Sequence, residues 1–126
     1  MNKKMDRFWE AKDGRTGTTP VRVIAGGVVR AGTNEYGITT FDVAVRGKKI
    51  ADGQYETDYI NGITVGKDAS DGFKKLIAEL KPGSKVCAVC DVGYKEGVDK
   101  EGNPKTFENF YLTDFELLSS PKTPEQ

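Results

Sequence analysis

The sequence predicts an all-β domain that carries one helix. Short segments in which apolar and polar residues alternate, rich in β-branched and aromatic side chains, recur along the chain. Glycine accounts for 15 of the 126 residues, above the usual ~7%, as expected for a fold with many turns and bends. Only one segment has the apolar spacing of an amphipathic helix. A chain of this length is expected to form one domain.

Residues 1–20 are predicted to form a loosely ordered N-terminal extension, with a short ordered piece at Phe8 and Trp9. They are mostly polar and are interrupted by glycine and proline. The first strand is expected at 21–30. Within it, the glycine pair at 26–27 breaks a run of β-branched residues, as at a bulge or a tight bend.

Two strands are expected next, at 39–46 and 54–65, joined by a basic connection at 47–53. In the first of them, alternate residues define a buried face, formed by Phe41, Val43 and Val45. In the second, strict alternation places one set of residues on a single face: Tyr55, Thr57, Tyr59, Asn61, Ile63 and Val65. This strand is thus predicted to carry its tyrosines on the same face as its last apolar residues.

The helix is predicted at 73–80, because four apolar residues recur there at the spacing i, i+3, i+4 and i+7. They are Phe73, Leu76, Ile77 and Leu80. A polar side chain just before them can cap the first turn, and Pro82-Gly83 ends the helix. The candidates for the cap are Asp68, Ser70 and Asp71.

The last two strands are expected at 86–92 and 106–118, with a hairpin tip at 96–104 between them. The full order is then β-β-β-α-β-β, which is the order of a five-stranded OB-fold barrel. A small sandwich of strands and a helix would give a similar order and is the alternative. In the barrel interpretation, 21–118 form the OB-fold domain and 119–126 form a short flexible tail.

The residue types exclude several kinds of chemistry. No histidine occurs in the chain, which excludes Ser-His-Asp and Cys-His catalysis and metal sites with histidine ligands. Cys87 and Cys90 have C-x-x-C spacing, but in a strand pattern residues i and i+3 face opposite sides, about 10 Å apart. We expect them to be ordinary strand residues, one of them buried. The carboxylates form no recognisable acid–base pair, so we expect no enzyme activity, no bound metal and no cofactor.

The net charge is zero but is unevenly distributed. Residues 1–50 carry 10 Lys or Arg and 5 Asp or Glu, whereas 51–126 carry 9 and 14. This distribution argues against a protein that binds polyanions over its whole surface and is compatible with a local basic groove. No apolar run approaches the ~18 residues of a membrane span, and no secretory signal is evident. We therefore expect a cytoplasmic protein without a membrane partner.

Aromatic and basic residues recur together on the predicted strand faces and loops. The set consists of Tyr36, Arg46, Lys48, Lys49, Tyr55, Tyr59, Lys67, Tyr94 and Lys95. Single-stranded nucleic acid needs this combination, because its phosphates attract cations and its bases stack on flat rings. The alternative is that the tyrosines are half-buried barrel residues and that the lysines only keep the protein soluble. As a whole, the set predicts a nucleic-acid interface.

Most of the chain, from about Val21 to Leu118, resembles the single-stranded DNA-binding protein family of bacteria and their phages. The resemblance rests on the order and spacing of segments at 23–26, 41–45, 56–60, 65–67, 81–86 and 99–102. The run Glu-Thr-Asp-Tyr that ends at Tyr59, for example, is similar to the family's Glu-Thr-Asp/Glu-Trp run. The resemblance implies an OB fold, sequence-tolerant binding of single-stranded DNA, and a homotetramer, with a homodimer as the alternative.

By position, Tyr59 takes the place of the family's stacking aromatic residue, and Lys67 matches the lysine that follows its strand-end glycine. Val65 stands where the family often has a further aromatic ring. The rings that can replace it are Tyr36, Tyr55 and Trp9. The short tail lacks the family's acidic tip, so recruitment of replication proteins through the tail is not expected. Such a tail fits a phage-encoded protein in a bacterial host cell.

These observations together predict a non-enzymatic protein that coats and protects single-stranded DNA during replication, recombination and repair. Two alternatives remain. The acidic second half of the chain favours an adaptor for protein–protein contacts, in which the tyrosine-bearing face forms the interface. An OB barrel can also bind single-stranded RNA.

Overall fold

Six strands and one helix make up the part of the chain that the computed structural model describes, residues 2–120. In chain order they are β1 (Asn2–Glu10), β2 (Thr16–Thr33), β3 (Thr39–Ala51), β4 (Gln54–Val65), α1 (Asp71–Ala78), β5 (Lys85–Val98) and β6 (Pro104–Ser119). The predicted tail at 119–126 lies outside the described residues from 121 onward. No helix within 2–120 has the length and apolar character needed to cross a membrane.

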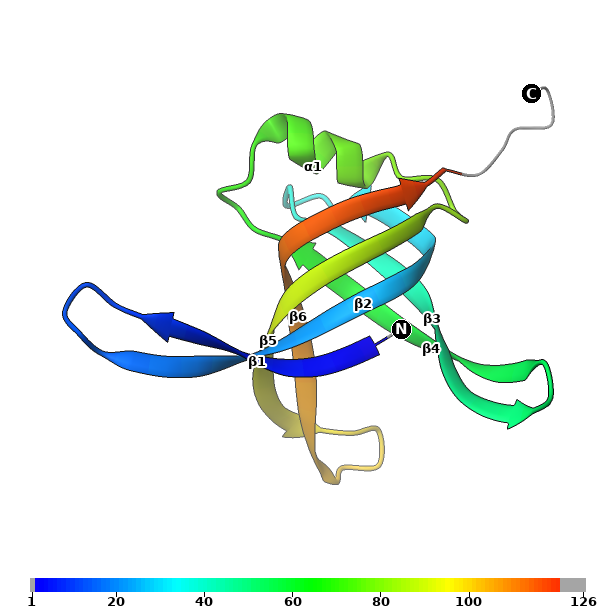
Figure 1. Ribbon diagram of the computed structural model, residues 1–126, viewed down its shortest axis with the longest axis horizontal. Helices are drawn as coiled ribbons and strands as arrows, with labels where there is room; N and C mark the ends of the chain where they lie inside the picture. Colours follow the sequence, from blue (N-terminus) through cyan, green and yellow to red (C-terminus); the bar gives the residue numbers. More distant parts are fainter. Residues whose placement is uncertain (1, 121–126) are drawn as a thin grey trace.

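Strands β2 to β6 close into a barrel, with the order β2-β3-β4-β6-β5 and a further pairing of β2 with β5. The β4–β6 pairing is short and parallel, whereas the other pairings of the barrel are antiparallel. Figure 1 shows α1 at one end of this barrel. The predicted five-stranded OB-fold barrel with one helix is confirmed, and β1 precedes it as a sixth strand.

The barrel interior is apolar because alternate residues of its strands point inward. On β3 the predicted inward residues are all buried: Phe41, Val43 and Val45. Helix α1 contributes Ile77, which is fully buried. The Phe73 ring of α1 packs edge-on against Phe115 of β6, which packs in the same way against Phe41. Burial of an apolar side chain of this size contributes about 1.5–3 kcal/mol, so the barrel wall is a rigid support for its outer surface.

Helix α1 begins directly after its N-cap. The Ser70 hydroxyl accepts a hydrogen bond from the Phe73 N–H (3.2 Å), which identifies the cap among the three predicted candidates. The last helical residue is Ala78, and Leu80 beyond it is buried. Leu76, which was predicted to lie in the buried stripe, is half exposed. The buried stripe of the helix is therefore narrower than the apolar spacing predicts.

The first 20 residues differ from the predicted loose extension. Strand β1 pairs antiparallel with the first part of β2, which begins at Thr16 rather than at 21. The Arg7 guanidinium lies 3.0 Å from the Asp91 carboxylate of β5, and the Trp9 ring packs against Gly17. The prediction failed because backbone hydrogen bonds can pair two polar strands without an apolar pattern in the sequence.

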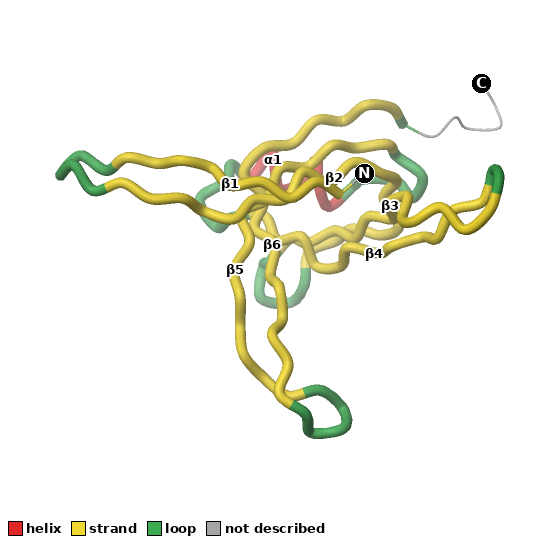
Figure 2. Tube along the Cα trace, turned by 60° about the horizontal axis from the view of Figure 1, so that its bottom comes forward, coloured by secondary structure: helices red, strands yellow, loops and turns green. Residues whose placement is uncertain are grey.

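Three hairpins extend beyond the barrel and point in different directions (Figure 2). We call the hairpin of β1 and β2 at residues 5–20 arm 1. The hairpin of β3 and β4 at residues 46–57 is arm 2, and the hairpin of β5 and β6 at residues 92–110 is arm 3. Residues 47–53 were predicted to connect two strands, but β3 continues to Ala51 and turns at 52–53. Their basic side chains are therefore held on the paired strands of arm 2 rather than on a loop.

A bulge interrupts β4 at Asn61 and Gly62. These two residues lie opposite a single residue of β3, Asp42. The Asp42 carboxylate accepts a hydrogen bond from the Gly62 N–H (2.8 Å) and forms an ion pair with Arg30 (2.8 Å). Gly62 has a φ of 74°, in the left-handed region that favours glycine. The bulge is thus held by both a side chain and a backbone conformation.

The bulge changes which residues of β4 face the core. Strict alternation predicted that Tyr59 shares a face with Ile63 and Val65. In the structure Ile60, Ile63 and Val65 are all buried, whereas Tyr59 is exposed. The prediction is wrong beyond Asn61, because one extra residue shifts the alternation and moves the later side chains to the other face.

A second irregularity lies in β2, but not at the predicted glycine pair. The register with β3 shifts at Val29, between Val28 and Arg30. Gly26 has a different role, since a Cβ there would collide with the Ala44 carbonyl of β3. The glycine therefore allows the close approach of β2 and β3 along the outer wall of the barrel.

Candidate nucleic-acid interface

The side chains predicted to bind nucleic acid all lie on the surface. The exposed fractions of the four tyrosines are 80% for Tyr36, 59% for Tyr59, 57% for Tyr94 and 41% for Tyr55. The five basic residues are exposed as well: Arg46, Lys48, Lys49, Lys67 and Lys95. None of these rings belongs to the barrel core, although Tyr55, Tyr59 and Tyr94 are each about half covered by neighbouring residues.

Arm 2 brings the first group together. The Arg46 guanidinium lies over the Tyr55 ring, 4.4 Å from its centroid, in a cation–π contact. Lys49 is the cross-strand partner of Tyr55, and its ammonium group lies 3.3 Å from the Asp52 carboxylate at the turn. Lys48 lies on the same arm and forms no salt bridge within residues 2–120. This arm presents the Tyr55 ring beside Arg46 and Lys49, whereas Lys48 lies in a bulge opposite Glu56.

Tyr59 lies on β4 between arm 2 and the helix end of the barrel. Its cross-strand partner is Ala44, whose small side chain leaves the ring uncovered on that side. A hollow of about 550 Å³ extends along the outer wall here, and its lining includes Ala44, Gly26, Arg46 and Lys85. Tyr59 does not line this hollow, but the strand register places it on the same face of β4 as Tyr55.

A second group surrounds another hollow, of about 520 Å³, at the far end of β4. Its lining includes Tyr36 from the β2–β3 turn, Lys67 after β4, Lys74 of α1 and Tyr111 of β6. The Lys74 ammonium group donates a hydrogen bond to the Lys67 carbonyl (2.8 Å). The structure therefore brings two predicted residues, Tyr36 and Lys67, together with two that sequence analysis did not single out.

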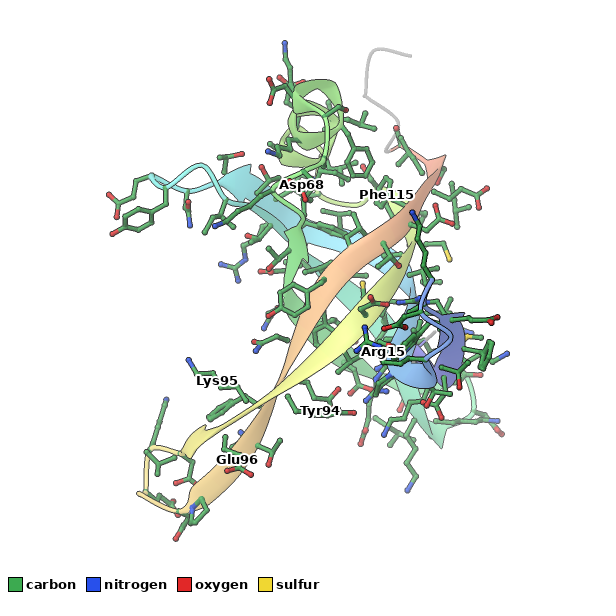
Figure 3. The ribbon with its side chains drawn as sticks, turned by 90° about the vertical axis from the view of Figure 1, so that its left-hand side faces the viewer. Arg15, Asp68, Tyr94, Lys95, Glu96 and Phe115 are labelled. Carbon is green, nitrogen blue, oxygen red and sulfur yellow. The ribbon has the colours of Figure 1, made fainter. Side chains whose placement is uncertain are left out.

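Tyr94 and Lys95 lie apart from both groups, on arm 3. Figure 3 shows them on opposite sides of this hairpin, as expected for consecutive residues of a strand. The cross-strand partner of Tyr94 is Glu108, whose carboxylate pairs with the buried Arg22 at 2.7 Å. The structure therefore does not place all nine predicted residues in one groove, and it separates Tyr94 from Lys95.

Two of the residues that sequence analysis missed were hidden by their apolar surroundings. Tyr111 stands between Phe110 and Leu112 in the sequence, yet its side chain is 49% exposed. Its ring packs against Gly93 of the neighbouring strand. Phe107 on arm 3 is also exposed and packs against Gly97 in the same way, with the Lys105 ammonium group 5.2 Å from its ring centroid. In both cases an aromatic side chain lies over a glycine of the neighbouring strand. That pairing is the sequence signal by which both exposed rings could have been predicted.

Several carboxylates near these surfaces are paired with arginine side chains. Asp42 pairs with Arg30, Asp91 with Arg7 and Glu108 with Arg22. An opposite charge at 2.7–3.0 Å offsets much of the repulsion that a carboxylate would exert on a phosphate. Two of these three carboxylates, Asp91 and Glu108, belong to the acidic second half of the sequence.

The C-x-x-C pair behaves as predicted for two strand residues of which one is buried. Cys90 is buried and Cys87 is partly buried, and both thiols are free. Burial, followed by the nearby Asp91 carboxylate, raises the pKa of the Cys90 thiol from 9.0 to about 12. A thiol with such a pKa is protonated and unreactive at neutral pH. Among residues 2–120, no cluster of three or more His, Cys, Asp or Glu side chains could hold a metal ion.

No protein-family model matches this sequence, and no curated protein matches it. Solved structures do match. The mitochondrial single-stranded DNA-binding protein Rim1 of S. cerevisiae matches with a TM-score of 0.59 at 17% sequence identity, covering 82% of this chain and 98% of that one. A small single-stranded DNA-binding protein from Streptomyces coelicolor matches with a TM-score of 0.53 at 12% identity, covering 79% and 94%.

At these identities the likeness concerns the fold. Nearly the whole length of both solved proteins is covered, so the barrel is matched as a unit rather than through a shared hairpin. The independent evidence of strand order and barrel closure agrees with it. The chain therefore has the OB-fold barrel that these two single-stranded DNA-binding proteins have.

Proposed function

We propose that this protein binds single-stranded DNA without sequence preference along the outer surface of β3 and β4. The observation that carries this proposal is a row of exposed rings beside cations on one strand surface. The row runs from Arg46 and Tyr55 through Tyr59 to Lys67. Val65 lies ten positions after Tyr55 on β4, which corresponds to roughly 30 Å of strand. That length accommodates several unpaired nucleotides.

The proposed mechanism combines stacking with phosphate contacts. Each base that stacks on a tyrosine contributes roughly 1–3 kcal/mol and does so for any base, because every base has a flat face. Arg46, Lys48 and Lys67 form no salt bridge within the described part of the chain and are free to meet phosphates. Phosphate contacts release counterions, so affinity should fall as salt rises.

A protein that covers unpaired bases in this way would block re-annealing and nuclease attack during replication, recombination and repair. The fold shared with two single-stranded DNA-binding proteins supports this role. We further propose that the protein is not an enzyme and works as a homo-oligomer, a tetramer or a dimer, in the cytoplasm of a bacterial host. A phage origin is part of the same proposal.

Fluorescence titration tests the proposal directly. A dT oligonucleotide is titrated into the protein at low and at higher salt, and a duplex of equal length serves as the control. We expect binding to the single strand that weakens with salt, and much weaker binding to the duplex. Absence of binding to dT at low salt would contradict the proposal. Competition between DNA and RNA single strands decides which polymer is preferred.

A protein–protein adaptor is the second candidate, and one observation favours it. Strand β1 pairs only with β2 within residues 2–120, and it exposes Met5 and Phe8 on arm 1. Exposed apolar side chains on an edge strand are typical of a surface that another chain covers. This surface is distinct from the β3–β4 row, so partner binding through arm 1 and DNA binding are compatible.

A further inference from the structure

We infer that the 520 Å³ hollow at the end of β4 is a pocket for one nucleotide of the bound strand. Its base would lie against the rings of Tyr36 and Tyr111, and its phosphate beside Lys67 and Lys74. This inference rests on the proposed function and deepens it. The nucleotide in the hollow would be enclosed on several sides, whereas the other nucleotides would stack on the open surface of the strands.

The Tyr36 ring is presented by an ordered turn although it is the most exposed of the tyrosines. The Asn34 side-chain oxygen accepts hydrogen bonds from the N–H groups of Tyr36 (2.9 Å) and Ile38 (3.0 Å). The Asn34 N–H in turn donates to the Ile38 carbonyl (2.9 Å). A ring on such a turn loses little backbone entropy when a base stacks on it, so more of the stacking energy appears as affinity.

The Tyr111 ring forms a second aromatic surface of the hollow. Its packing against Gly93 fixes its position, since a Cβ at Gly93 would lie 3.1 Å from the ring. The backbone of Tyr111 pairs with Thr64 of β4, which places the ring beside the end of the proposed DNA row. About half of the side chain stays exposed. That free half can receive a base without rearrangement of the barrel.

The charges of the hollow suit a phosphate. Lys67 and Lys74 line it, and none of its lining residues is acidic. The hydrogen bond from Lys74 to the Lys67 carbonyl holds the Lys74 ammonium group in place and uses only one of its three protons. The volume of about 520 Å³ lies within the range of roughly 300–1,000 Å³ for small-ligand pockets. A base with its sugar and phosphate is a ligand of this size class.

Photochemical crosslinking tests the inference. Short dT oligonucleotides, each with a single 5-iododeoxyuridine, are bound to the full chain at low salt and irradiated, and the crosslinked peptides are identified by mass spectrometry. We expect one nucleotide position to crosslink to Tyr36 or Tyr111 with higher yield than any other position crosslinks elsewhere. Tyr111→Leu should lower the affinity about tenfold, as expected for the loss of one stacked base.

Phe8→Leu is the matched control, because Phe8 is an exposed aromatic side chain on arm 1, away from the hollow. It should leave the Tyr36 crosslink in place. Tyr36→Ala provides a second variant on an exposed turn, where folding is not at risk, and it should also weaken binding. Unchanged affinity in both Tyr36→Ala and Tyr111→Leu, with wild-type binding intact, would overturn the pocket and leave the proposed function standing. Absence of wild-type binding would overturn both.

Discussion

At the residue scale, Asp42 and Gly62 decide which way the tyrosines of β4 point. The carboxylate of Asp42 accepts a hydrogen bond from the Gly62 N–H, and Gly62 adopts the left-handed backbone conformation that the bulge requires. The bulge allows Ile60 and Ile63 to enter the core together while Tyr59 stays outside. The exposure of Tyr59, where we propose that a base stacks, thus depends on two residues outside the proposed row.

Gly62→Ala should destabilise the protein by about 1–2 kcal/mol, because a Cβ is unfavourable in the left-handed region. Urea denaturation measures the change. Gly72→Ala is the matched control, since Gly72 lies in α1 without a positive φ and with open space around it. Alanine favours helix there, so this variant should be neutral or more stable. Equal destabilisation by the two substitutions would contradict the role given to the bulge.

The buried Cys90 thiol is expected to make the free energy of unfolding fall at alkaline pH. Its pKa is raised from 9.0 to about 12 by burial, so the folded state keeps a proton that the unfolded state loses. Stability should therefore fall as the pH rises from about 9 towards 12, since the unfolded state binds fewer protons in that window. The free energy of unfolding, measured against pH, should fall less steeply in Cys90→Ala than in the wild type.

The same burial protects the thiol from reagents. At pH 8 the partly buried Cys87 should react with a thiol reagent before the buried Cys90 does. Cys87→Ala should then leave a slow reaction at Cys90 that accelerates in denaturant. Fast labelling of Cys90 in the folded protein would show that the residue is not buried as described.

At the element scale, arm 2 carries basic side chains on paired strands, which holds them beside Tyr55 at a defined spacing. Replacement of Arg46, Lys48 and Lys49 by alanine should weaken binding to dT and also reduce its salt dependence. Each phosphate contact to a single strand contributes about 0.7 to the slope of log affinity against log salt, so the triple variant should lose about 2. Titration at several salt concentrations measures this slope.

Arm 1 offers the matched control for that experiment. Lys12 and Arg15 are also exposed but lie at the turn of arm 1, which projects from the barrel away from arm 2 (Figures 1 and 2). Their replacement by alanine should leave the slope nearly unchanged. A loss of slope per replaced residue as large as that of the arm 2 variant would mean that general positive charge, rather than arm 2, attracts the strand.

At the scale of the whole molecule, the question is whether the tyrosine surface binds DNA or another protein chain. The double variant Tyr59→Leu with Lys67→Ala removes two exposed side chains, so the core remains intact. We expect a loss of dT affinity with an unchanged oligomeric state. Size-exclusion chromatography with light scattering gives the mass, and titration gives the affinity. Dissociation of the oligomer would instead show that the tyrosine-bearing surface, rather than arm 1, is a protein–protein interface.

Much of the fold follows from local patterns. Apolar alternation on β3 correctly placed Phe41, Val43 and Val45 in the core, and one apolar stripe located the only helix within residues 2–120. The order of these elements favoured the OB-fold barrel over a small sandwich, and the closure of the barrel by the β2–β5 pairing decided between them. The exposure of Tyr59 was not predicted correctly, because strict alternation placed its side chain on the same face as Ile63 and Val65.

The remaining features depend on contacts between distant segments. Which side chains of β4 face the core depends on the bulge at Gly62. Asp42, 20 residues earlier in the chain, stabilises that bulge by a hydrogen bond. Arm 1 forms through backbone pairing, which leaves no apolar signature. The hollow joins Tyr36, Lys67, Lys74 and Tyr111 from four separate elements. Side-chain alternation is a property of a single strand and can be read from the sequence. The surface that these four residues share depends on how the closed barrel brings distant segments together, and only the tertiary structure contains that information.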